Sequence, residues 1–306
     1  MTPHAVFLQQ LMNGLTIGVV YALIALGYTM VYGIIQLINF AHGEIFMLGA
    51  YLGLAILVLG GVAGAAGGLA AIGLGVVGGL AAIGGCAVVG WLVERVAYRP
   101  LRQSPKLAAL ITAIGASFVL QNAAMLCYGA RDRYVPNPFP VSQWQWGGVA
   151  MTGMQVLIAA VALTVMIGLQ WFIRATTLGQ AMRATAQDPV AARLMGIPVD
   201  RVIAWTFMIG SGLAGIGGAL FGIYYTTINF HDGYLTGLKA FTAAVLGGIG
   251  NVPGAVLGGL LLGLLEGLGA GYLSSQWKNV LAFAVLVLLL LFRPRGLLGE
   301  RVAERA

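Results

Sequence analysis

The chain has 306 residues, of which 59% are hydrophobic and 8% are charged, whereas a soluble domain carries about 25% charged residues. This deficit excludes an ordinary soluble protein, because most of the surface must face something other than water. The formal net charge is +7. The basic residues lie in a few loops between apolar runs, which indicates membrane topology rather than nucleic-acid binding. We therefore expect an all-α, polytopic membrane protein that contacts lipid and has no nucleic-acid partner.

Three apolar segments open the chain, at about residues 11–35, 44–60 and 68–93. Each is long enough for one crossing, which takes ~20 residues. The first segment lacks the basic start of a cleavable signal peptide, so we expect it to be a membrane helix. The basic loop at 95–106 follows the third segment. The positive-inside rule places this loop in the cytoplasm and the N-terminus outside.

Further apolar segments follow, and one of them is short. They cover about residues 107–128, 154–173, 202–228, 255–272 and 280–292, with a shorter run at 238–246. The shorter run cannot cross as a straight regular helix, so a broken or re-entrant element is expected, shielded by protein or lining a cavity. We expect a single membrane domain over residues 1–306, with about eight crossings (eight to ten), an external loop at 129–153 and a cytoplasmic C-terminus.

Glycines recur at intervals of four in the segment at 255–272: Gly259, Gly263, Gly267 and Gly271. Overlapping G-x-x-x-G patterns of this kind let two helix backbones approach closely. The sequence therefore predicts that this face packs against another helix.

The longest polar interruption is residues 174–201, RATTLGQAMRATAQDPVAARLMGIPVDR. Apolar residues recur in it at helical spacing. Asp188 before Pro189 is typical of a helix start, and Gly196 before Pro198 is typical of a helix end. We therefore expect one or two short amphipathic helices. Such a basic insert can lie at the lipid interface or dock a cytoplasmic partner, and the residues alone leave both interpretations open.

No catalytic, metal or cofactor site is expected. The lysines lack the upstream glycines of a phosphate-binding loop, so the chain is not expected to bind ATP through one. Histidines and cysteines have no ligand-like spacing. Two acids, Glu44 and Glu266, fall at membrane depth, where an acid is a functional hypothesis by default.

Both acids also have structural interpretations. Glu44 lies in the first turn of an expected helix, where the helix dipole favours a carboxylate, and His42 is a candidate partner for it. Glu266 can bond a neighbouring helix. Asn229, Asp232 and Lys239 can lie solvated at the outer rim.

Several stretches resemble the LivH-type permeases, which are membrane subunits of branched-chain amino acid ABC importers. They are residues 14–51, ERVAYRPLR at 94–102, the loop at 188–201, KAFTAAVLGGIGNVPGA at 239–255 and RPRGLLG at 293–299. The resemblance covers nearly the whole chain. It implies a multi-pass permease in the bacterial inner membrane. It also implies a second homologous, LivM-like permease, two cytoplasmic ATPases and a periplasmic amino acid-binding protein as partners.

The same resemblance makes residues 181–198 the element that docks on the ATPase. The residues matched there are Ala181, Met182, Arg183, Asp188, Pro189, Arg193, Leu194, Gly196 and Pro198. This chain has Gln180-Ala181-Met182 where the wider coupling signature has Glu-Ala-Ala, so its contacts are less determined than its role. The candidate transport-pathway residues are Asn39, His42, Glu44, Asn229, Lys239 and Glu266.

Three alternatives remain at this point. Close relatives within the resembled family move urea or short amides, and motifs alone do not separate them from amino acid permeases. An ion-coupled secondary transporter would need inward-facing acids near the midplane, for which Glu44 and Glu266 are the candidates. A purely structural membrane subunit is disfavoured by the expected broken helices.

Overall fold

The computed structural model describes residues 3–62, 68–102, 104–140, 142–146, 148–293 and 295–299. These form a helical bundle with very little strand, as predicted. The helices are α1 (Pro3–Ile35), α2 (His42–Leu59), α3 (Leu69–Val93), η1 (Glu94–Tyr98), η2 (Arg99–Leu101), α4 (Lys106–Tyr128), α5 (Gly153–Ala175), α6 (Thr177–Gln187), α7 (Pro189–Leu194), α8 (Val199–Tyr225), α9 (Asp232–Gly247), α10 (Val252–Tyr272) and α11 (Trp277–Phe292).

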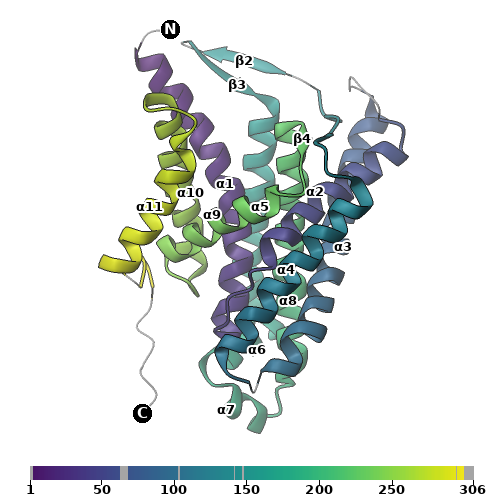
Figure 1. The fold of residues 1–306 in the computed structure, drawn as a ribbon, viewed down its shortest axis with the longest axis vertical. Helices are drawn as coiled ribbons and strands as arrows, with labels where there is room; N and C mark the ends of the chain where they lie inside the picture. The colour runs from purple at the N-terminus through teal and green to yellow at the C-terminus, as the bar shows by residue number, and fades with distance from the viewer. Residues whose placement is uncertain are drawn as a thin grey trace.

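Within the described residues, seven helices are long and apolar enough to cross a membrane: α1, α2, α3 with its continuation, α4, α5, α8 and α10. α9 and α11, which cover the last short apolar runs, are shorter. α9 and α11 have 16 residues each, about 24 Å at 1.5 Å per residue, less than the ~30 Å hydrocarbon core of a bilayer. The predicted short element is thus α9, which runs obliquely across the middle of the molecule (Figure 1).

The core lies around α8, which packs against α1, α2 and α3. α8 is rich in glycine, and its backbone lies against the other helices without intervening side chains. A Cβ at Gly210 would lie 3.2 Å from the carbonyl oxygen of Gly27 on α1, and one at Gly215 would lie 2.5 Å from the carbonyl oxygen of Ala82 on α3. By contrast, α3, α4 and α5 are mostly exposed in the isolated chain, so they offer surface to lipid or another subunit.

α10 packs lengthwise on α1, which confirms the predicted glycine contact face. A Cβ at Gly267 would lie 2.6 Å from Cα of Gly14, and one at Gly18 would lie 2.9 Å from the carbonyl oxygen of Gly259. Glycines on both helices therefore allow the short distance between the α1 and α10 backbones. The partner helix was not identified by the sequence analysis, although Gly14 and Gly18 form a G-x-x-x-G pair of their own.

The basic segment after α3 is helical rather than an open loop. α3 continues through a π-helical turn, η1, and a 3₁₀ turn, η2. The strands are short: β1 (Arg133–Tyr134) pairs antiparallel with β4 (Thr227–Ile228), and β2 (Gln143–Trp146) pairs antiparallel with β3 (Val149–Thr152). The β2–β3 hairpin and the start of α1 lie at one end of the molecule, and α6 and α7 lie at the other (Figure 1).

Candidate functional site

The break between α1 and α2 places polar side chains in the interior of the helical bundle. α1 ends at Ile35, Gln36 takes a left-handed conformation with φ of 52°, and residues 36–41 carry the chain back until α2 begins at His42. His42 is fully buried. Its ring packs on Tyr28 of α1, with centroids 4.6 Å apart in an edge-on arrangement. The polar start of α2 is therefore held inside the bundle.

His42 does not pair with Glu44, contrary to one of the interpretations above. No hydrogen bond joins the His42 ring to Glu44 among the described residues. Glu44 instead reaches α4, where Ser117 Oγ donates to Glu44 Oε1 at 3.2 Å. The second carboxylate oxygen, Oε2, is buried and has no hydrogen-bond partner in the described part of the chain. This leaves one acidic oxygen unsatisfied at membrane depth.

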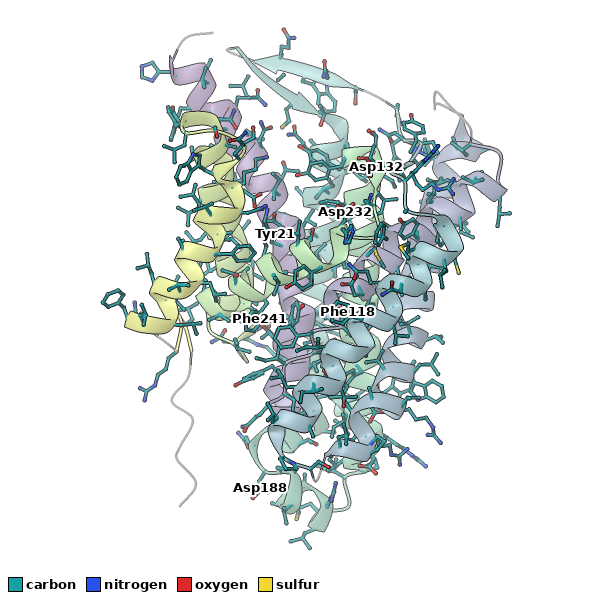
Figure 2. The ribbon with its side chains drawn as sticks, in the orientation of Figure 1. Tyr21, Phe118, Asp132, Asp188, Asp232 and Phe241 are labelled. Atoms are coloured by element: carbon teal, nitrogen blue, oxygen red, sulfur yellow. The ribbon has the colours of Figure 1, made fainter. Side chains whose placement is uncertain are left out.

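A pocket of about 170 Å³ is lined in part by two residues that contact Glu44. Its wall comes from α1, the 36–41 segment, α4 and α9, and its lining residues are Tyr28, Phe40, Ile114, Ser117, Phe118, Gly233, Tyr234, Gly237 and Leu238. Two of these touch Glu44: Ser117 through its hydrogen bond and Gly233, which lies against Oε2. The lining is otherwise mainly apolar. Figure 2 shows Phe118 at mid-height on α4.

Lys239 and Glu266 form a second polar cluster, between α9, α10 and α1. Lys239 Nζ donates to Glu266 Oε1 at 2.7 Å, and Tyr21 OH donates to Glu266 Oε2 at 2.7 Å. All three side chains are buried. Lys239 is therefore not a solvated residue of the outer rim, because α9 carries it inward to meet Glu266. Both oxygens of Glu266 are satisfied, and the pair is electrically neutral.

The other two candidate pathway residues lie away from this pocket. Asn39 is buried beside η1, where Tyr98 OH donates to its Oδ1 at 3.3 Å. Asn229 lies before α9, where its Nδ2 donates to Asp132 Oδ1 at 2.6 Å and its backbone N–H donates to Asp232 Oδ2 at 2.7 Å. Figure 2 shows Asp132 and Asp232 above the level of Phe118. Asn39 and Asn229 thus join chain segments and do not line the pocket beside Glu44.

Residues 176–198 form two short helices with a sharp break, as the spacing predicts. Asp188 caps α7, its Oδ1 accepting from the backbone N–H groups of Val190 at 2.8 Å and Ala191 at 3.0 Å. Pro189 occupies the first turn. Gly196 ends the helix with φ of +81°, which few other residues adopt, and Pro198 immediately precedes α8.

The two helices differ in exposure. On α6, Met182 is 4% exposed and packs in the core, so its side chain is unavailable to a partner and we remove it from the expected docking contacts. Ala181 is half-buried, and Arg183 donates to the carbonyl oxygen of Ile173. On α7, Leu194 is 84% exposed. The surface open to a partner is therefore on α7 and the turn after it: Val190, Arg193, Leu194 and Met195.

Asp200, in the first turn of α8, connects this surface to the end of α3. Its carboxylate forms ion pairs with two arginines of the segment after α3, Arg102 at 2.7 Å and Arg99 at 3.4 Å between nitrogen and oxygen. The guanidinium of Arg193 on α7 lies 3.7 Å from the same carboxylate. Arg102 also pairs with the buried Glu94. A groove lined by Arg99, Arg193 and Asp200 among others opens beside α7.

The family model described as "Branched-chain amino acid transport system / permease component" matches residues 10–290. The chain belongs to this permease family. It is 48% identical to the high-affinity branched-chain amino acid transport system permease protein LivH of Escherichia coli strain K12, over 98% of this chain and 97% of that protein. It is also 48% identical to the permease protein BraD of Pseudomonas aeruginosa, over 98% of both chains. The probable LivH protein of Methanocaldococcus jannaschii is 25% identical over 90% of this chain.

In this permease, sequence reasoning missed three residues that the structure makes prominent. Tyr21 donates a hydrogen bond to Glu266, and Ser117 donates one to Glu44. Asp200 forms ion pairs with arginines from two segments. Ser117 offered a usable signal, since it is a hydroxyl within an apolar segment, and polar groups at membrane depth are functional candidates. Tyr21 and Asp200 offered little signal, because their partners are 245 residues and about a hundred residues away in the sequence.

Proposed function

We propose that this chain is the membrane-spanning permease subunit of an ATP-driven importer of branched-chain amino acids (Leu, Ile and Val). The observation that carries the proposal is the full-length likeness to permeases named for high-affinity branched-chain amino acid transport, at 48% identity. In this proposal residues 1–306 form one permease domain in the bacterial inner membrane. No lysine follows the glycines of a phosphate-binding loop, so ATP hydrolysis is assigned to partner chains.

The proposed assembly adds a second, homologous permease of the LivM type, two cytoplasmic ATPases and a periplasmic amino acid-binding protein. Two surfaces support it. The exposed apolar residues of α7 and of the turn after it, with Leu194 and Met195 above 80% exposure, suit an apolar groove on an ATPase. Arg193 beside them suits acidic residues at the rim of that groove. The largely exposed helix α4, which walls the pocket beside Glu44, suits a second permease subunit.

The proposed orientation has the N-terminus outside and α6, α7 and the C-terminus in the cytoplasm. The basic residues at 95–106, 174–201 and 293–305 support it. The described helices also support it, because seven long helices with α9 and α11 as short passes give an odd number of crossings. An odd number of crossings places the two termini on opposite sides of the membrane.

Cysteine labelling tests this orientation. In a background with Cys86 and Cys127 replaced by Ala, Gln187→Cys should react only with reagent on the cytoplasmic side, and Ser142→Cys only with reagent outside. Positions Gln103 and Ala303 are expected to behave like Gln187, and they lie outside the described residues. Labelling of Gln187→Cys from outside would contradict the proposal, because α7 could not then meet an ATPase.

Transport measurements test the substrate and the energy source. The complex is reconstituted in proteoliposomes with its binding protein, and uptake of labelled leucine is measured with ATP inside. We expect ATP-dependent leucine uptake that persists when a protonophore collapses the proton gradient. Uptake of urea or acetamide in place of leucine would favour the amide permeases. Loss of uptake with the protonophore would favour ion coupling, which the neutral Lys239–Glu266 pair disfavours.

A further inference from the structure

The segment ERVAYRPLR at 94–102 lies beside α7 and has no role in the proposed function. Arg99 in η2 and Arg102 directly after it both form ion pairs with Asp200, in the first turn of α8. The guanidinium of Arg193 on α7 lies 3.7 Å from the same carboxylate. One carboxylate therefore connects three elements: the end of α3, α7 and the start of α8.

Two hollows open around this cluster, with volumes of about 490 Å³ and about 440 Å³. Arg99, Arg193 and Asp200 line both of them, so the two hollows adjoin along these three side chains. Arg102 lines the first hollow and Arg201 lines the second. We call the two hollows together the arginine groove.

The arginine groove is strongly basic. Among its described lining residues, four are arginines and one is an aspartate. Glu94 is buried and already pairs with Arg102. The side chains of Arg99 and Arg193 are 45% and 60% exposed and meet Asp200 only at 3.4 and 3.7 Å, so much of each guanidinium faces water. A carboxylate that enters the groove can accept charge-assisted hydrogen bonds from them.

The arginine groove lies on the aqueous side of a level marked by exposed tryptophans. Trp91 on α3, Trp171 on α5 and Trp205 on α8 are all exposed, and exposed Trp gathers at the membrane interface. Asp200 precedes Trp205 by five residues of α8, about 7.5 Å at 1.5 Å per residue. Figure 2 shows Asp188, which caps α7, at the same end of the molecule. This position favours a partner in water over the lipid hydrocarbon.

We propose that the arginine groove is a second docking surface for the cytoplasmic ATPase and that it receives an acidic segment of that subunit. The inference rests on the proposed function, because it takes the ATPase as the partner from there. The groove is continuous with the exposed apolar surface of α7, since Arg193 belongs to both. An ATPase docked in this way contacts the end of α3, α7 and the start of α8 at once. Its movement then reaches two membrane helices directly, in addition to α7.

The experiment measures binding of the complex's own purified ATPase to the permease subunits in nanodiscs of phosphatidylcholine, a lipid without net charge. Arg99→Glu reverses one charge of the groove. We expect it to weaken ATPase binding about tenfold or more at low salt, and by less at high salt, where charges are screened. The variant should fold, because Arg99 is half exposed and Arg102 still pairs with Asp200.

Arg95→Glu is the matched control. Arg95 lies on η1 in the same basic segment and is exposed, but it does not line the groove. ATPase binding by Arg95→Glu should stay near that of the wild type. Equal weakening by the two variants would show a diffuse attraction to this basic end of the molecule and would overturn the groove as a docking surface.

A second variant keeps the proposal testable if Arg99→Glu does not assemble. Arg201 is exposed, lines the second hollow and lies in the first turn of α8, where the helix dipole favours an acid. Arg201→Glu should therefore fold and should also weaken ATPase binding.

The outcomes separate the groove from the proposed function. Wild-type ATPase affinity in assembled Arg99→Glu and Arg201→Glu would overturn the groove, and the proposed function would stand. Weakening that appears only when phosphatidylglycerol is added to the nanodiscs would assign the groove to anionic lipid headgroups and would overturn it too. Failure of the wild-type permease to bind the ATPase would instead overturn the proposed function.

Discussion

Glu44 and Glu266 are both acids inside the helical bundle, and they differ in how their oxygens are satisfied. Glu266 is 4% exposed and bonds Lys239 and Tyr21 through its two oxygens. Glu44 is 1% exposed and has a partner, Ser117, on one oxygen only. Burial alone therefore does not identify a functional acid. We therefore compare the partners of each oxygen, because a fully satisfied acid needs no ligand and a half-satisfied one can take one.

The surroundings of the two acids reinforce the difference. Glu266 lies where α10 meets α1 and α9, on the helix whose glycines bring the backbones together. None of the three residues in its cluster lines the pocket between α1, α4 and α9. Glu44 does not line the pocket either, but two residues that contact it, Ser117 and Gly233, do. We interpret the Glu266 cluster as structural and the Glu44 cluster as functional, and four predictions test this division.

The largest expected effect on stability comes from Lys239→Met. This change leaves the Glu266 carboxylate buried without its counter-charge, which costs about 3–5 kcal/mol when a buried pair is broken in this way. The measurement is the thermal unfolding midpoint and folded yield of the purified protein in detergent. The double variant Lys239→Met with Glu266→Gln should recover much of the loss, since no buried charge remains. A single variant as stable as the wild type would refute the structural interpretation.

Gly267→Leu should be the next most damaging. Even a Cβ at this position would lie 2.6 Å from Cα of Gly14, so the larger side chain must separate α10 from α1. Overpacking of this kind costs about 1–3 kcal/mol or more, and the Glu266 cluster should loosen with it. The control is Leu265→Ile on the exposed side of the same helix. Leu262, which is fully buried, is unsuitable as a control. Equal folded yields for the two variants would contradict the close approach.

Glu44→Gln should change stability by less than about 1 kcal/mol, in contrast to Lys239→Met. The amide oxygen can still accept from Ser117, and the change removes the cost of burying a charge. The same thermal unfolding measurement applies. A destabilisation as large as that of Lys239→Met would show that Glu44 is structural too, and the distinction between the two acids would be lost.

Leu194→Asp should have the smallest effect on stability, within about 0.5 kcal/mol for an exposed site, and yet abolish stimulated ATP hydrolysis and uptake. Its side chain is 84% exposed on α7 and belongs to neither cluster. Arg193→Ala should weaken coupling less, and in a salt-dependent way. Normal coupling in an intact Leu194→Asp complex would return α7 to the alternative of a helix resting on lipid.

Within the polar stretch, local chemistry was sufficient for prediction. Asp188 before Pro189 sets a helix start, and Gly196 before Pro198 sets an end, because caps and φ restrictions act over a few residues. The glycine periodicity of α10 likewise predicted a contact face. These features depend on neighbours in the chain, so they were visible without the fold. The prediction that Met182 lies on the docking surface was wrong. Its burial depends on packing against other helices, which the residues of its own segment do not specify.

The sequence by itself determined the class of the protein: a polytopic helical membrane permease with a basic, capped insert between its spans. Apolar length, charge placement and local caps decide those features one segment at a time. Only the tertiary structure decided which acid is paired. Lys239 meets Glu266 because α9 carries it inward across 27 residues of chain, and Glu44 meets Ser117 across 73 residues rather than His42 two residues away. Such partners follow from how the helices pack, and the order of residues along one helix does not specify them.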